Sequence, residues 1–115
     1  MVLPLKKQSS GGVLVVLVTA VNQGEAVKIG KKVVAAKLAA CVSIIPGLQS
    51  IYRWKGKVVK EQEALLIMKS TKKCYRALER AVKTMHTYET PEIIALPIEA
   101  GFGRYIEWVH SETHS

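Results

Sequence analysis

The segment from Gln49 to Lys69 has the pattern of one long β-hairpin, and it constrains the fold more than any other part of the chain. Tyr52 and Trp54 lie two residues apart, as on one face of a strand, and Gly56 supplies a turn residue that accepts a positive φ. The returning strand, residues 58–69, would be about 40 Å long at roughly 3.3 Å for each of its ~12 residues. A compact domain of this size is only about 34 Å across. We therefore expect the hairpin to extend beyond its own core.

A ribbon that extends into solvent tends to pair with other chains unless something covers its edges. This hairpin carries several large apolar side chains, which makes that tendency stronger: Ile51, Tyr52, Trp54 and Val58. A second copy of the same chain is the simplest cover. The hairpin therefore predicts a homo-oligomer.

Length and composition indicate one globular domain. The chain has 115 residues, of which 49% are hydrophobic, and this is enough for a single core. We expect residues 13–115 to form the domain and residues 1–12 to form a flexible tail. The net charge of +8 favours anionic partners, although the basic residues are spread out and also fit an ordinary solvated surface. Cys41 and Cys74 stand far apart, which fits a reducing compartment better than a disulfide framework.

The N-terminal region has some features of a short signal peptide. Lys6 and Lys7 precede the apolar run at 13–18, but polar and glycine residues at 9–12 interrupt the pattern. We expect no cleaved leader here. No stretch approaches the ~18 to 20 apolar residues of a membrane span, so no membrane partner is predicted.

The hydrophobic periodicity predicts the order βαββαβ followed by a C-terminal helix. The run Val13–Thr19 is apolar on both faces, as in a central strand. Four strands with two helices on one face form an α+β, ferredoxin-like sandwich, and this leaves the opposite face uncovered. The other expected elements are a helix capped by Asn22 with Glu25 as capping-box partner, a strand at 38–45 that Pro46 and Gly47 break or bend, the hairpin, a helix capped by Ser70 or Thr71, an edge strand at 92–99 containing Pro97, and a helix at 104–111.

Few residues could carry chemistry, and none forms a recognisable site alone. Cys41 is a possible soft ligand for Cu(I) or Zn(II), but a cysteine between two small apolar residues also fits a core position. Cys74 is expected in the first turn of a helix, where a thiol can be reactive, and it equally fits the margin of the apolar stripe. The cysteines therefore leave both interpretations open.

The segment HTYETPE at 86–92 places an imidazole, a phenol and two carboxylates in a short stretch. Such a combination can bind a cation or act as an acid and a base. It fits equally well an ordinary helix end, with His86 as the cap and Glu89 in solvent. Tyr105 and Trp108 could line a pocket near this segment or belong to the core, and the sequence does not decide between these.

Several motifs together resemble the CutA divalent-cation tolerance family. They are LAACVSIIP at 38–46, SIYRWKGKV at 50–58, Glu63 before LLIMKS at 65–70, HTYETPEIIALPI at 86–98 and YIEW at 105–108. The resemblance runs from residue 18 to about residue 109. It implies a ferredoxin-like subunit similar to those of the PII signalling proteins, assembled as a homotrimer. It also implies a cytoplasmic or organellar protein, of which we expect the cytoplasmic, linked to tolerance of copper and other divalent ions, with no established enzymatic reaction and no organic cofactor.

The resemblance also implies which residues act. Metal ligation is implied for Cys41 and His86. The other motif residues are implied to gather in clefts between subunits, and they are Tyr52, Trp54, Lys69, Tyr88, Glu89, Glu92, Tyr105 and Trp108. Ala20 and Val21 depart from the family pattern, which commonly has Cys or Thr and then Pro there. With fewer soft donors, we expect any metal site to be weak or shared between subunits.

Three other functions fit parts of the sequence. One is a PII-like sensor or scaffold that receives an anionic small molecule near Lys69, the metal being incidental. A second is nucleic-acid binding, but RNA-recognition modules stack bases on aromatic residues of their central strands, and segments 13–19 and 64–69 contain none. We therefore expect no specific nucleic-acid partner. A third is an enzyme that uses His86 and Glu89, for which the sequence suggests no substrate.

Overall fold

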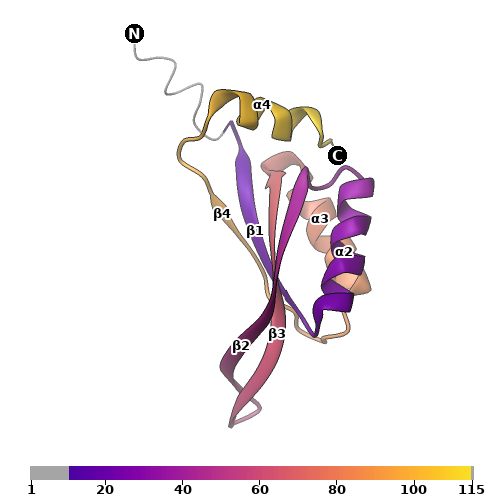
Figure 1. The fold of residues 1–115 in the computed structure, drawn as a ribbon, viewed down its shortest axis with the longest axis vertical. Helices are drawn as coiled ribbons and strands as arrows, with labels where there is room; N and C mark the ends of the chain where they lie inside the picture. The colour runs from indigo at the N-terminus through magenta and orange to yellow at the C-terminus, as the bar shows by residue number, and fades with distance from the viewer. Residues whose placement is uncertain (1–10, 115) are drawn as a thin grey trace.

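The computed structural model describes residues 11–114, so the flexible tail predicted at 1–12 lies almost wholly outside the described residues. The described part is an α+β, ferredoxin-like βαββαβ unit followed by a helix, as the sequence predicts (Figure 1). Its elements are β1 (Val13–Ala20), α2 (Gln23–Ala35), β2 (Cys41–Trp54), β3 (Lys57–Thr71), α3 (Lys72–Met85), β4 (Ile93–Pro97) and α4 (Gly103–Ser111).

The four strands form one antiparallel sheet in the order β2-β3-β1-β4. β1 pairs with β3 on one side and β4 on the other, which confirms it as a central strand. β4 pairs only with β1 and ends at Pro97, in agreement with the predicted edge strand. A proline at that position removes no hydrogen bond from the interior of the sheet.

Helices α2 and α3 cover one face of the sheet (Figure 1). Alternate strand residues such as Val16 and Leu66 point toward them and have no exposed surface. They pack with Ile29 of α2 and Leu78 of α3, which are also fully buried. Gly30 of α2 lies against β2, and a Cβ added there would be in van der Waals contact with Val42, at 3.4 Å from a methyl group. This face contains the main core.

Side chains fix where both of these helices begin. The Asn22 side chain accepts a hydrogen bond from the backbone N–H of Glu25 at 2.8 Å, which is the predicted N-cap of α2. The Glu25 carboxylate accepts in return from the backbone N–H of Val21 at 2.8 Å. Thr71, rather than Ser70, caps α3 through the backbone N–H of Cys74 at 3.3 Å.

The hairpin formed by β2 and β3 extends beyond the rest of the molecule (Figure 1). The described chain measures 54 × 26 × 22 Å, and its radius of gyration is 15.4 Å. A compact domain of this length has a radius near ~13 Å, so the predicted overhang is confirmed. At the tip Lys55 and Gly56 both have positive φ, 51° and 81°, as a two-residue type I′ turn requires.

The prediction for the strand before the hairpin was partly wrong. The strand begins at Cys41 rather than at residue 38, because Lys37 adopts a φ of 62° after α2 and the chain is still turning there. It then runs without a break to Trp54, and residues 46–47 only shift its pairing. A proline is tolerated at 46 because β2 is an edge strand.

The last helix closes one end of the sheet. Ile106 and Val109 of α4 form a small second core with Val13 and Ala40. Among the described helices, none is long and apolar enough to cross a bilayer.

The face of the sheet opposite α2 and α3 is largely open. Val15 and Leu17 of β1 and Leu65 and Ile67 of β3 lie on it and are half-buried. Toward the edges of this open face the exposure rises, to 48% for Ile45 on β2 and 52% for both Ile94 and Leu96 on β4. The expectation that the second face lacks a helical layer is therefore confirmed.

Candidate functional site

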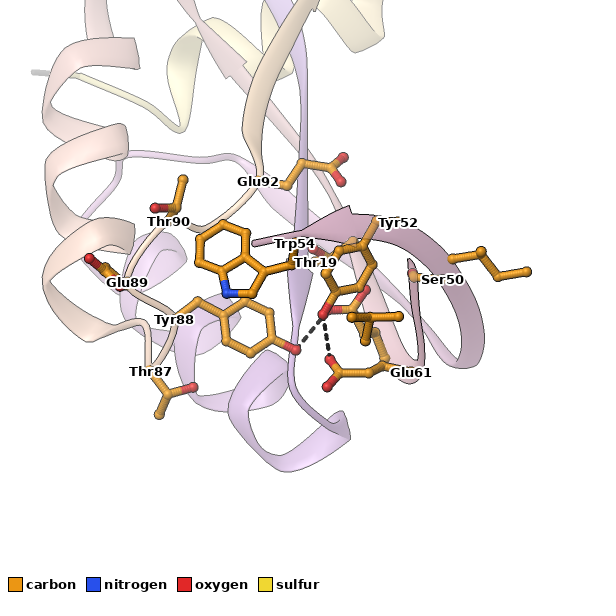
Figure 2. A pocket seen from close by; sticks show the side chains of 13 residues that line it. Thr19, Ser50, Tyr52, Trp54, Glu61, Thr87, Tyr88, Glu89, Thr90 and Glu92 are labelled. Atoms are coloured by element: carbon orange, nitrogen blue, oxygen red, sulfur yellow. Dashed lines mark hydrogen bonds between the residues drawn. The ribbon is translucent and has the colours of Figure 1, made fainter. Parts of the chain in front are cut away.

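A cavity of about 710 Å³ lies between the hairpin and the loop that joins α3 to β4, and its lining extends from Glu63 at the base of the hairpin to Trp54 beside the turn (Figure 2). We call it the hairpin-base cavity. Its volume falls within the roughly 300 to 1,000 Å³ that is typical of small-molecule sites. The residues lining it are Thr19, Ser50, Ile51, Tyr52, Trp54, Val59, Glu61, Glu63, Thr87, Tyr88, Glu89, Thr90 and Glu92.

A β-bulge in β2 determines which side chains face this cavity. Ile45 pairs with Leu65, but the next pair is Leu48 with Glu63, so residues 46–47 add one extra residue to β2. Successive side chains of a strand point to opposite faces, and the extra residue therefore reverses the alternation. Beyond the bulge it is the even-numbered residues of β2 that share a face with Glu63.

Tyr52 and Trp54 reach the hairpin-base cavity for this reason. The Tyr52 hydroxyl donates a hydrogen bond to the Glu61 carboxylate at 2.8 Å. This bond raises the pKa of Tyr52, because ionising the phenol would place two negative charges side by side. Both side chains remain partly exposed, at 36% for Tyr52 and 42% for Trp54. The hairpin thus supplies one wall of aromatic surface.

The loop after α3 supplies the opposite wall. Tyr88 donates a hydrogen bond from its hydroxyl to Glu63 at 2.7 Å. Burial, reinforced by this bond to a carboxylate, raises the pKa of Tyr88 well above that of a free phenol. Glu63 itself is only 5% exposed. The phenol therefore stays protonated and holds a buried carboxylate at the back of the cavity.

The hairpin-base cavity is acidic although the chain as a whole is basic. The whole chain contains nine acidic residues and carries a net charge of +8. Four of the nine, namely Glu61, Glu63, Glu89 and Glu92, line the cavity, and no Lys or Arg does among the described residues. An anion would therefore meet like charge here, whereas a cation would be attracted.

The loop that carries Tyr88 is fixed by two groups outside the cavity. Glu25 accepts hydrogen bonds from the backbone N–H and the hydroxyl of Thr87, at 2.9 and 2.8 Å. Burial alone would raise the pKa of Glu25, but the hydrogen bonds from Val21 and Thr87 outweigh it and the pKa is lowered. The α2 cap and the cavity loop thus share one carboxylate.

His86 is the second group, and both of its ring nitrogens are engaged. Nδ1 lies 3.0 Å from the backbone N–H of Tyr88, which can only donate, so Nδ1 is the acceptor. The ring proton then lies on Nε2, which donates to the carbonyl oxygen of Thr19 at 2.6 Å. His86 is 9% exposed and packs against the Tyr88 ring. Its role in the subunit is to link β1 to the cavity loop.

The remaining predicted residues lie at the other end of the sheet. Cys41 is half-buried on the open face, and its Sγ lies 3.4 Å from the hydroxyl of Tyr105 on α4. Burial and the hydrogen bond with Cys41 raise the pKa of Tyr105 to about 12. The Tyr105 ring packs near Trp108 at 5.6 Å between centroids. Lys69 pairs in register with Cys41 and does not line the cavity. In residues 11–114, Tyr105 and Trp108 are not among the side chains that line the cavity beside the 86–92 loop.

One chain does not bring Cys41 and His86 together. Cys41 pairs with Lys69, which pairs with Val15, whereas His86 binds Thr19, four residues further along β1 and thus about 13 Å away. Between residues 11 and 114, no three or more His, Cys, Asp and Glu side chains are grouped to hold a metal ion. A metal that used both residues would need more than one subunit.

The sequence did not single out the carboxylates at the back of the hairpin-base cavity as site residues. Glu63 is part of a family motif in the sequence, and no motif includes Glu61. A signal for Glu63 existed, since it is an acidic residue directly before the apolar run at 64–68.

Cys74 is 1% exposed, and this position fits the apolar stripe of α3.

The fold and the cavity define the class of protein: a ferredoxin-like subunit with an overlong β2–β3 hairpin and a C-terminal helix. Comparison with known proteins gives the family. A model of the CutA1 divalent ion tolerance protein matches residues 14–112. The chain belongs to this family, which consists of non-enzymatic tolerance proteins.

Individual relatives agree. The chain is 48% identical over 99 residues to a divalent-cation tolerance protein CutA of Thermus thermophilus, covering 86% of this chain and 96% of the relative. It is 42% identical to a chloroplastic CutA protein of Arabidopsis thaliana, covering 89% of this chain but only 56% of that longer relative. A solved structure of the T. thermophilus protein superposes with a TM-score of 0.87 at 46% identity, covering 89% of this chain and 99% of that one.

Proposed function

We propose that the protein serves divalent-cation tolerance as a cytoplasmic homotrimer that binds copper or a similar ion weakly at clefts between its subunits. The observation that carries this proposal is the incomplete burial of the single chain. One face of its sheet is open, and its hairpin stands clear of the core. Both are places where a soluble chain gains by packing against copies of itself.

The apolar side chains that assembly would cover are large, and those on the open face lie on paired strands. Ile94 and Leu96 of β4 lie beside β1, and Ile45 of β2 lies beside β3. On the hairpin, Ile51 is 70% exposed and Val58 is 67% exposed. Burying such side chains contributes about 1.5 to 3 kcal/mol each when the burial is complete. Assembly that covers them would also bring the ends of neighbouring sheets together.

Cys41 and His86 are the candidate ligands within this assembly. The Cys41 thiol is half-buried on the open face, close to where another subunit would pack, and thiolate sulfur favours Cu(I). His86 already uses both ring nitrogens, so it must give up a hydrogen bond to bind a metal. We therefore expect weak binding in which Cys41 carries the larger share.

The test combines light scattering with copper titration. Wild type, Cys41→Ser and His86→Ala are titrated with Cu(I) and Cu(II), and Cys74→Ala serves as the matched control because its thiol is buried. We expect a trimer at micromolar concentration, weaker copper binding in the first two variants and no change in the control. A monomer, or unchanged affinity in both variants, would contradict the proposal.

A second candidate is a small-molecule sensor, and the specific observation in its favour is the hairpin-base cavity. For such a sensor the sequence predicts an anionic ligand near Lys69. The acidic lining of the cavity disfavours an anion there, and Lys69 lies in register with Cys41 and Val15 instead. Thermal-shift measurements with anionic metabolites test this candidate, since a bound ligand raises the melting temperature.

A further inference from the structure

We infer that the hairpin-base cavity binds an aliphatic organic cation carrying more than one ammonium group, because it joins three aromatic side chains to four carboxylates with no Lys or Arg among its lining residues. This goes beyond the copper site proposed above and does not depend on Cys41 or His86. It rests on the aromatic surface, the charge and the size of the cavity.

The aromatic surface has the chemistry that attracts an ammonium group. Tyr52 and Trp54 come from the hairpin and Tyr88 from the facing loop, and Figure 2 shows their rings gathered at the cavity. The face of such a ring attracts a cation within about 6 Å of its centroid, and the indole does so best. The chain already uses this attraction, since the Lys55 Nζ lies 5.8 Å from the centroid of the Trp54 ring. An ammonium group is therefore at this indole even in the single chain.

The carboxylates surround the rings. Glu61 accepts from Tyr52 and Glu63 from Tyr88, so two of the four are held in place by phenol hydroxyls. In Figure 2, Glu89 and Glu61 lie on opposite sides of the aromatic group. A ligand with two ammonium groups joined by a methylene chain can reach separate carboxylates while its apolar chain lies on the rings.

The same arrangement suits a bare metal ion poorly. Hard divalent cations need about six oxygen ligands converging at roughly 2.0 to 2.6 Å. No three acidic, Cys or His side chains in residues 11–114 converge in this way. Aromatic carbon supplies no such ligand, and a cavity of about 710 Å³ far exceeds one ion. Size and lining therefore select an organic cation.

The probe is 1,4-diaminobutane dihydrochloride, titrated into the full-length assembled protein by calorimetry at constant ionic strength. We expect saturable binding at the hairpin-base cavity. The uncharged analogue 1,4-butanediol and the inorganic ion Mg²⁺, which carries the same charge, are expected to bind at least about tenfold more weakly. If either binds as tightly as the diamine, the inference is wrong.

Variants locate the site. Trp54→Ala is expected to weaken diamine binding about 3- to 30-fold, and Trp54→Phe, which keeps a ring, by less. Glu61→Gln should weaken it about 2- to 5-fold. Glu107→Gln, on the exposed surface of α4, is the matched charge control and should change nothing. Equal weakening by Glu61→Gln and Glu107→Gln would show attraction to general surface charge and overturn the assignment.

A further control separates the two proposals. Cys41→Ser should leave diamine binding unchanged, whatever it does to copper binding, because Cys41 does not line the cavity. Light scattering on each variant confirms that it assembles as wild type does. If Trp54→Ala does not, the comparison of Trp54→Phe and Glu61→Gln with Glu107→Gln decides the outcome.

Discussion

The two faces of the sheet are built from the same strands but bury their apolar residues to different degrees. Under α2 and α3, Val16, Val18 and Leu66 have no exposed surface. On the open face, Ile94 and Leu96 of β4 are each 52% exposed. The residue types are alike, so the difference comes from what lies on top of them. The chain's own helices complete one face only, and the candidate sites both lie on the other.

The largest effect is expected on the covered face. Leu66→Ala removes a fully buried side chain and leaves a cavity, which should lower the free energy of unfolding by about 2 to 5 kcal/mol. Denaturation by urea measures it. A loss below about 1 kcal/mol would mean that this face is not the closed core that the packing indicates.

A smaller effect, of a different kind, is expected on the open face. Leu96→Ala should cost about 1 kcal/mol per subunit, and chiefly through assembly, because half of the side chain is exposed in the single chain. Light scattering across a dilution series should show dissociation at higher protein concentration than in wild type. If Leu96→Ala destabilises the protein as much as Leu66→Ala, independently of concentration, the contrast between the faces fails.

A loss between those of Leu66→Ala and Leu96→Ala is expected for the buried pair at the hairpin-base cavity. Tyr88→Phe removes the hydrogen-bond donor to Glu63, which is 5% exposed, and should lower stability by about 1 to 3 kcal/mol. Tyr52→Phe is the matched control, because its partner Glu61 is exposed, and should cost less.

The same pair predicts an alkaline pH dependence. The pKa of Tyr88 is raised in the folded chain, so the unfolded phenol loses its proton first, at about pH 10. The stability contributed by Tyr88 is therefore fully present below about pH 10 and is lost as the pH rises toward its folded pKa. Unfolding curves at several alkaline pH values should show a shallower decline in Tyr88→Phe than in wild type. Parallel declines would contradict this.

The smallest effect is expected at Glu25, which joins the α2 cap to the cavity loop. Glu25→Gln weakens the bonds from Val21 and Thr87, and solvent screening keeps the loss below about 1 kcal/mol. The lowered pKa of Glu25 means that its contribution is present above pH 4.5 and is lost as the pH falls through the folded pKa. Wild type and Glu25→Gln should thus converge in stability below that range. A difference that persists in acid would point to another cause.

The sequence predicted those parts of the fold that depend on local patterns. The alternation and turn residue of the hairpin, the apolar run of β1 and the Asn22 cap each act within a few residues, so each could be recognised before any contact was known. Even the extension of the hairpin beyond the core could be predicted, because the expected strand is longer than a compact domain of this chain length is wide. The first residue of β2 was missed because the turn at Lys37 depends on its φ of 62°, which no pattern in the sequence indicates.

The candidate site was less predictable because it depends on register and on distant segments. Tyr52 and Trp54 meet Tyr88 only through the pairing of β2 with β3 and the packing of the 86–92 loop on β1. Cys41 and Tyr105 meet at the opposite end of the sheet. The family resemblance implied that these residues gather in clefts between subunits, and within the single chain they lie in two separate places.

The extra residue at 46–47 gives β2 one residue to spare. If Gly47 were deleted, Pro46 would oppose Ala64 and Leu48 would still pair with Glu63, so the ladder would become regular with no change of face beyond it. Tyr52 and Trp54 would keep the side of the ribbon that lines the hairpin-base cavity. The facing strand β3 has no extra residue in its pairing with β2. The hairpin should therefore tolerate a shortening of its first strand better than a shortening of its second.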